Sequence, residues 1–161
     1  MPFSSSIVTR LHYQHKSLVD MIDGLSDEKI RRQINPGKWS IFENMVHLQT
    51  YQHAFCARMK QLLTGTNPVF VRYSAEADPM FLDNCHLATR EIIQDLLVTR
   101  KKMLVELTSV GDQDVLKTAV HPVFGTLTMA EWLNFFLLHE AHHMFTVFRL
   151  AGQIKKAQEN L

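Results

Sequence analysis

Several features that would indicate particular classes of protein are missing from this sequence. Its 161 residues include two cysteines, Cys56 and Cys85, which lack the CxxC spacing of a redox or zinc motif. Two cysteines without this spacing are expected to be reduced, partly buried thiols rather than part of a disulfide framework. No apolar run approaches the ~18 residues of a membrane span, and no basic segment followed by an apolar core opens the chain. We therefore expect no membrane contact and no signal peptide, which favours a cytoplasmic protein.

An excess of charge of one sign is also missing. The chain has 17 Lys and Arg residues against 16 Asp and Glu residues, a net charge of +1. This balance argues against a nucleic-acid partner, which would require a concentrated positive surface. The longest basic runs are Arg31-Arg32 and Arg100-Lys101-Lys102, and we expect both to be solvated helix surface.

No convincing strand pattern with a period of two is present, whereas four long segments have apolar residues at helical spacing. These segments cover approximately residues 5–24, 40–63, 78–110 and 128–152, and a further turn or two is expected at 27–33. Ser40 with Glu43, and Thr128 with Glu131, form two capping-box patterns, which predict where the second and fourth helices begin. We expect the polar tail after residue 152 to fray.

Four helices of about twenty residues predict an all-α four-helix bundle, with residues 1–161 forming a single domain. The connectors at approximately 64–78 and 111–127 are longer than the two to eight residues that usually join antiparallel neighbours in a bundle. At least one is therefore expected to cross over the bundle. The fourth helix is apolar nearly all round, which predicts burial on more than one side, either in the bundle or at a homodimer interface.

The fourth predicted helix also carries His139, Glu140, His142 and His143. His139 and His143 are four residues apart, so they share one helix face and can reach a single ion. That face continues the apolar stripe, where an imidazole without a partner is costly. A divalent metal suits this spacing best, and the alternative is a pair of core histidines bonded to other polar groups.

Residues 139–143 also match HExxH, the motif in which two histidines bind zinc and a glutamate activates water in zinc proteases. Such proteases usually draw a third ligand from further along the chain. Here the only carboxylate side chain after His143 is Glu159, in the tail. The chain also lacks strands that would pair with an extended peptide, so a zinc protease is a minor alternative.

A metal site that keeps an open position usually has three protein ligands, so a third is required. His47 lies on the flank of the apolar stripe of the second predicted helix, from which it can face a neighbouring helix. His12, His15 and His53 compete with it, and periodicity does not choose among them. His121, in the connector before the fourth helix, is expected either to line the mouth of the site or to occupy a turn.

A series of short motifs extends along the chain: Trp39-Ser40, Glu43, His47, Gly125-Thr126-Leu127-Thr128, Trp132, His139, His142 and His143. In this order they resemble the DinB/YfiT-like superfamily, in which Trp-Ser precedes the second helix and a His-x-x-His-His pattern lies in the fourth. The resemblance implies a four-helix bundle with up-down-down-up topology and a long crossover. It also implies a divalent metal held by His47, His139 and His143, with His142 beside the ligands.

Neither glutamate near these histidines is assigned a catalytic role. Glu43 is explained by its capping box, and Glu140 points away from the face that His139 and His143 share. Three neutral imidazoles suit zinc or nickel best, with iron, cobalt or manganese as alternatives.

The resemblance further implies chemistry on a small-molecule substrate. Related families include bacillithiol- and mycothiol-dependent transferases or isomerases, together with proteins regarded as metal-dependent hydrolases. We therefore expect thiol transfer or hydrolysis, with a low-molecular-weight thiol as one candidate substrate. The alternatives are a metal-binding bundle without catalytic turnover and a dimerisation bundle whose histidines bond only one another.

Overall fold

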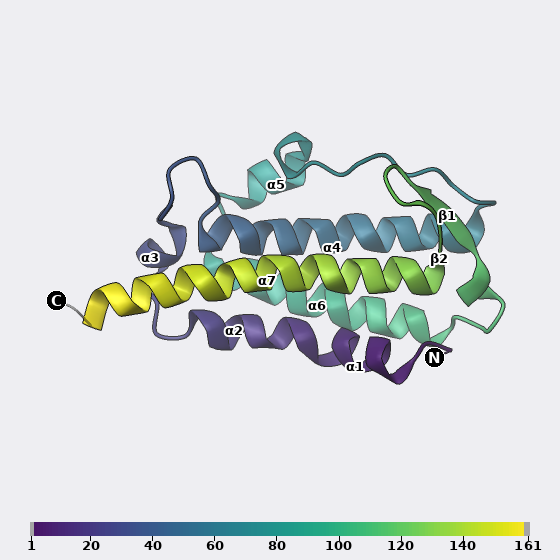
Figure 1. Cartoon of the computed structure of the whole chain (residues 1–161), viewed down its shortest axis with the longest axis horizontal. Helices are drawn as coiled ribbons and strands as arrows, with labels where there is room; N and C mark the ends of the chain where they lie inside the picture. Colours follow the sequence, from purple (N-terminus) through teal and green to yellow (C-terminus); the bar gives the residue numbers. More distant parts are fainter. Residues whose placement is uncertain (1, 160–161) are drawn as a thin grey trace.

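The computed structural model of the chain describes residues 2–159, which form a predominantly helical structure (Figure 1). In chain order the elements are α1 (Ser5–Tyr13), η1 (Gln14–Lys16), α2 (Ser17–Ile22), α3 (Asp27–Arg31), α4 (Ile41–Thr64), η2 (Ala75–Ala77), α5 (Pro79–Asn84), α6 (Thr89–Thr108), η3 (Asp114–Leu116), β1 (Thr118–His121), β2 (Gly125–Thr128) and α7 (Met129–Glu159). The η elements are single 3-10 turns.

Four helical columns form a bundle, which confirms the predicted all-α fold class. The columns are α1 continued by α2, α4, α6 and α7; α4 packs against α6 and α7, and the α1–α2 column packs against the same two helices. Figure 1 shows α4 and α6 running in one direction along the bundle and the other two columns running in the opposite direction. The parallel pair is joined by the long segment from Gly65 to Ala88, which returns over the outside of the bundle.

Both predicted capping boxes are confirmed. At the start of α4, the Ser40 hydroxyl accepts the Glu43 N–H at 3.1 Å, and the Glu43 carboxylate accepts the Ser40 N–H at 2.7 Å. At the start of α7, the Glu131 carboxylate accepts the Thr128 N–H at 2.8 Å. These bonds satisfy amides that the first turn of a helix leaves without partners.

The interior is divided into two apolar clusters with a polar layer between them. One cluster includes Leu11, Phe55 and Trp132, and the other includes Leu18, Met45 and Leu150. The buried polar side chains lie between them along the same helices; they include His15, His47, Gln49, Thr50, Gln52, Thr99, Arg100 and Glu140. Each must find a polar partner there, because a buried polar group without one destabilises the fold.

The helices differ from their predicted bounds in three places. The predicted helix at 5–24 is interrupted by η1 at Gln14–Lys16, which directs the Gln14 amide onto the Leu137 carbonyl and the Glu140 carboxylate. The predicted third helix is divided into α5 and α6, and the Glu91 carboxylate accepts the Ala88 N–H at the second start. The tail predicted to fray is instead helical to Glu159, because Ile154 is buried in the core; residues 160–161 lie outside the described part.

The expectation that the chain has no strands was wrong for one short segment. Residues 118–128 form an antiparallel hairpin, in which Thr118 pairs with Thr128 and His121 pairs with Gly125. Gly125 has a φ of +73°, which glycine adopts without steric cost. Val69, from the crossover segment, forms a parallel bridge with Val120 of β1. Four-residue strands are too short to produce a clear alternation, so the sequence pattern did not reveal them.

α7 packs against α4 on one side and against the α1–α2 column on another, so the expected burial on more than one side is confirmed. Leu138, Phe145 and Phe148 of this helix remain about 60% exposed on its outer face. This face leaves room for the predicted homodimer, which remains a prediction. Among the described residues, no helix has the length and apolar character needed to cross a membrane.

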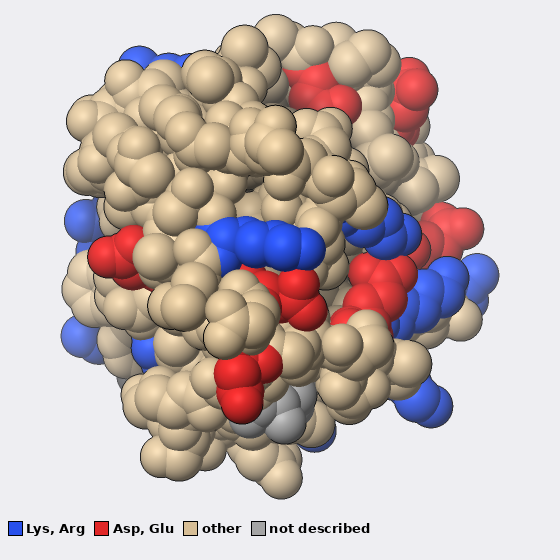
Figure 2. All heavy atoms as spheres, turned by 90° about the vertical axis from the view of Figure 1, so that its right-hand side faces the viewer, with Lys and Arg blue, Asp and Glu red and all other residues tan. Residues whose placement is uncertain are grey.

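The surface shows no large region of a single charge at the hairpin end of the bundle. Figure 2 views this end, and its acidic and basic side chains are interspersed around a broad uncharged area. The even distribution agrees with the balanced composition of the chain.

Candidate metal centre

The polar layer between α4 and α7 brings three histidines together. His47 comes from the second turn of α4, and His139 and His143 come from consecutive turns of α7. One ring nitrogen of each lies within 4.8 Å of those of the other two, and the Nε2 atoms of His47 and His139 are 3.1 Å apart. The structure therefore brings together the three residues that the resemblance implied, although His47 precedes His139 by 92 residues in the chain.

A partner outside the cluster orients His143. Its Nδ1 lies 2.9 Å from the Asn44 Oδ1, while the Asn44 side-chain amide donates to the Ser40 carbonyl at 2.8 Å. The Asn44 oxygen accepts the proton on Nδ1, so the lone pair of His143 is on Nε2. A hydrogen bond of this kind fixes the tautomer of histidine ligands in metal sites.

The other two histidines lack such a partner. The Nδ1 atoms of both His47 and His139 are buried and have no hydrogen-bond partner in the described part of the chain. Two neutral imidazoles whose Nε2 atoms lie 3.1 Å apart can share at most one hydrogen bond, whereas the lone pairs of both Nε2 atoms can bind one cation. A cation at the convergence of the three rings would use the lone pairs of all three, so the donor set fits a divalent transition metal.

Burial keeps the three rings neutral. It lowers the pKa of His47 to about 4. Together with the neighbouring histidines, burial lowers the pKa of His139 to about 3 and that of His143 to about 2. At pH 7 each ring therefore retains a lone pair for a cation, as an imidazole ligand must.

Aromatic side chains enclose the histidines. The Trp39 ring centroid lies 5.0 Å from that of His47, and the Tyr51 centroid lies 4.1 Å from that of His139. The Tyr73 hydroxyl lies 2.9 Å from the Thr50 hydroxyl of α4 and donates to Asp78 at 2.7 Å, so it joins the crossover segment to α4 beside His47. Trp39 thus forms a wall of the site, whereas Trp132 is fully buried and donates to the Ala119 carbonyl.

Two cavities reach the cluster from different sides. His47 and His139 line a cavity of about 360 Å³ together with β1, the hairpin turn and the start of the crossover segment; we call it the hairpin-side cavity. His143 lines a second cavity of about 580 Å³ together with Trp39, Glu76 and Arg149, which we call the Trp39-side cavity. The histidine cluster is therefore accessible to small molecules from two directions.

His121 lines the hairpin-side cavity, and this is one of the two locations that the sequence left open for this residue. Its Nδ1 accepts the backbone N–H groups of Val123 and Phe124, each at 3.1 Å. The neutral ring consequently carries its proton on Nε2 and acts as a hydrogen-bond donor. Burial and the nearby Arg58 lower the pKa of His121, which also favours this neutral form.

Glu140 belongs to a different network from the histidines. Its carboxylate pairs with Arg100 and accepts the Gln14 amide at 2.8 Å, and only 3% of its surface is exposed. Such a carboxylate is not available to activate water, so the structure disfavours the HExxH protease alternative. The expectation that Glu140 points away from the ligands is confirmed.

The expectation that Arg100 is solvated surface was wrong. Arg100 is 1% exposed and donates to Gln52 at 2.7 Å, to the Leu11 carbonyl at 3.2 Å and to His15 Nδ1 at 3.2 Å. The charge is tolerated in the interior because its N–H groups donate to these acceptors and Glu140 neutralises it. Its basic neighbours concealed this role in the sequence.

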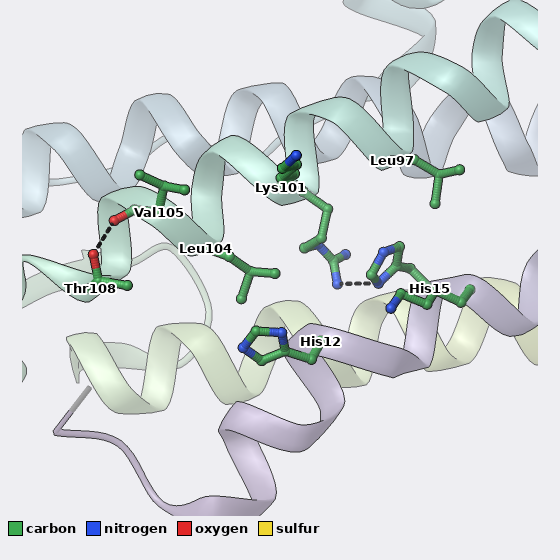
Figure 3. A pocket seen from close by; sticks show the side chains of 9 residues that line it. His12, His15, Leu97, Lys101, Leu104, Val105 and Thr108 are labelled. Atoms are coloured by element: carbon green, nitrogen blue, oxygen red, sulfur yellow. Dashed lines mark hydrogen bonds between the residues drawn. The ribbon is translucent and has the colours of Figure 1, made fainter.

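The competing histidines lie elsewhere. His12 and His15 line a cavity of about 480 Å³ between the α1–η1 segment and α6 (Figure 3), where His15 contacts Arg100. His53 pairs with Asp95 at 2.6 Å on the α6 side of α4. His142 is exposed beside His143 and lines the Trp39-side cavity, next to the cluster but outside it. Cys56 and Cys85 are free and partly buried, as expected.

Comparisons with known proteins agree with this fold. The sequence profile of the DinB superfamily matches residues 10–147. YuaE, an uncharacterised protein of Bacillus subtilis strain 168, is 25% identical over 148 residues, covering 84% of this chain and 91% of YuaE.

Two solved structures show the same architecture. YfiT from Bacillus subtilis, described as a probable metal-dependent hydrolase with an unusual four-helix bundle topology, superimposes with a TM-score of 0.82 at 18% identity, covering 93% of this chain and 86% of YfiT. A DinB-like protein from Bacillus cereus ATCC 10987 superimposes with a TM-score of 0.62 at 19% identity and 91% coverage of each chain. Because the profile covers most of the sequence, the chain belongs to the DinB superfamily.

Proposed function

We propose that this protein is a metal-dependent enzyme in which His47, His139 and His143 hold a divalent transition metal. The observation that supports it best is the convergence of three neutral imidazoles at the wall of open cavities. Zinc or nickel fits three nitrogen ligands best, and iron, cobalt and manganese are the alternatives. No carboxylate of the described residues joins the cluster.

We propose that the reaction is hydrolysis or thiol transfer on a small molecule. A metal held by three histidines supplies a Lewis acid and lowers the pKa of a bound water or thiol. The likeness to YfiT, which is described as a probable metal-dependent hydrolase, supports hydrolysis. The two cavities support transfer, because they would allow a thiol and a second substrate to approach the cluster separately.

The chain's own residues would prepare this chemistry. Asn44 holds His143 in the tautomer that leaves Nε2 able to bind a cation. Tyr51 and Trp39 pack against the rings and would shield the cluster from water where neither cavity opens. His121 supplies a hydrogen-bond donor at the hairpin wall. We further propose a single domain, a cytoplasmic location and a homodimer, in keeping with the sequence analysis.

Metal analysis of protein purified without a histidine tag tests the proposal. After metal supplementation we expect about one equivalent of transition metal per chain, and less than about 0.1 equivalent would contradict the proposal. His47→Ala and His143→Ala should each lower the affinity to a similar extent. His53→Ala is the matched control, because His53 lies on the same helix as His47 but pairs with Asp95. If His47→Ala leaves affinity unchanged, His47 is not a ligand.

A further inference from the structure

The charged side chains of the hairpin-side cavity all have the same sign. Arg58 and Arg72 line the cavity, and among the described residues no Asp or Glu does. Neither arginine has a carboxylate partner within residues 2–159, whereas the buried Arg100 is neutralised by Glu140. Two unneutralised guanidinium groups at a cavity with low-dielectric walls create a field that attracts an anion.

Arg58 is held in position at this wall. Its guanidinium donates to the Val71 carbonyl at 2.8 Å and lies 5.9 Å from the centroid of the Tyr51 ring and 5.5 Å from that of Phe70. The half-buried group is therefore ordered before a ligand arrives. A guanidinium presents five N–H donors in a planar fork, which matches the two oxygens of a carboxylate.

The hairpin contributes a donor as well. Because the Nδ1 of His121 accepts two backbone amides, its proton is on Nε2. The Tyr73 hydroxyl, by contrast, already donates its proton to Asp78. Arg58, Arg72 and His121 are thus all donors, which favours a ligand with hydrogen-bond acceptors and negative charge.

Apolar side chains form the outer part of the same cavity. Val71 of the crossover segment and Val123 and Phe124 of the hairpin turn line it while remaining 82%, 70% and 60% exposed. Phe135 of α7 lies beneath them, with its ring centroid 5.7 Å from that of Phe124. An apolar group entering the cavity would cover these side chains and be stabilised by that burial.

We propose that the substrate entering this cavity is an amphipathic organic anion. Its carboxylate, or an equivalent oxyanion, pairs with Arg58 and Arg72, and its apolar body packs against Val123 and Phe124. The reacting group then lies at the end lined by His47 and His139. This inference deepens the proposed function. Its statement about the reaction rests on the proposed function, whereas its statement about the binding of the anion does not.

A matched pair of ligands tests the role of the negative charge. The first is 4-(mercaptomethyl)benzoate, and the second is the corresponding neutral amide; both have the same thiol and the same ring. Titration calorimetry on the zinc-loaded protein should show the benzoate binding about tenfold more tightly than the amide, as expected for hydrogen bonds to a charged group. Raising the salt concentration should weaken the benzoate alone.

Substitutions assign the effect to the arginines. Arg58→Gln and Arg72→Gln should each weaken the benzoate several-fold and leave the amide unchanged. Lys38→Gln is the control, because Lys38 lines the Trp39-side cavity instead. Arg72 is exposed, so its variant should retain the fold, and urea unfolding verifies this for both. Equal affinities for the two ligands, or arginine variants with no effect, would overturn the anion proposal and leave the metal centre intact.

A second pair without the thiol separates this proposal from that of the metal. 4-Methylbenzoate and 4-methylbenzamide are titrated into the metal-free protein. A preference for the benzoate that Arg58→Gln abolishes would support the anion site even if no metal binds to the histidines. Failure of both benzoates to bind better than their amides would refute it in either form of the protein.

Discussion

The ion pair between Arg100 and Glu140 gives the sharpest test of how the polar layer is stabilised. Both side chains are almost fully buried, and Glu140 is the one acidic partner of Arg100 among the described residues. Glu140→Gln would keep the shape of the side chain and remove its charge. Arg100 would then remain buried with only neutral acceptors, Gln52, the Leu11 carbonyl and His15.

The expected loss in the free energy of unfolding of the Glu140→Gln variant is large. Removing one partner of a buried ion pair typically costs about 3–5 kcal/mol, because the other charge is left without compensation. The variant amide would also place N–H donors near the Gln14 amide, which now donates to Glu140. A loss of this size is a large fraction of the 5–15 kcal/mol by which domains are typically stable.

Urea unfolding of the metal-free protein, followed by circular dichroism, measures this loss. Glu106→Gln is the control, because Glu106 forms an exposed pair with Lys60 at 3.1 Å and should contribute at most about 1 kcal/mol. Replacing Arg100 and Glu140 together by methionine should recover most of the stability. A Glu140→Gln protein as stable as the Glu106→Gln control would refute the reasoning. It would also reopen the HExxH protease alternative if the variant stayed folded but lost a hydrolytic activity.

Two further predictions concern buried histidines. Asn44→Ala removes the acceptor of the His143 Nδ1 proton and should lower metal affinity about 10–100-fold; competition with a chelator measures this, and an unchanged affinity would show that the bond does not orient the ligand. The pKa values of His15 and His47 fall to about 3 and about 4 on folding, so at acid pH the unfolded state binds protons that the folded state does not. The free energy of unfolding of the metal-free protein should therefore keep the full contribution of these histidines above pH ~6.5. Below this pH it should decrease by up to about 1.4 kcal/mol per pH unit for each of them. Urea unfolding between pH 7 and pH 5 measures this decrease, and a flat profile would contradict the assigned burial of the rings.

Local sequence determined the main helices, the two capping boxes and the close placement of His139 and His143. Helical spacing and cap bonds involve residues three or four positions apart, so their consequences are visible without any tertiary contact. The division of α5 from α6, the interruption at η1 and the hairpin escaped this reasoning. They depend on bonds that join distant segments, such as Gln14 to Glu140 and Val69 to Val120.

Only the tertiary structure decided which other groups surround the histidine pair. The packing of α4 against α7 places His47 beside His139, and it leaves His12, His15 and His53 with other partners. The packing of α6 against α4 and the α1–η1 segment buries Arg100, which its basic neighbours made appear solvated. The return of the crossover segment brings Arg72 to one cavity with Arg58 and the hairpin. The spacing of residues along one helix predicts which side chains share a face, but the partner of that face depends on how the helices are arranged in space.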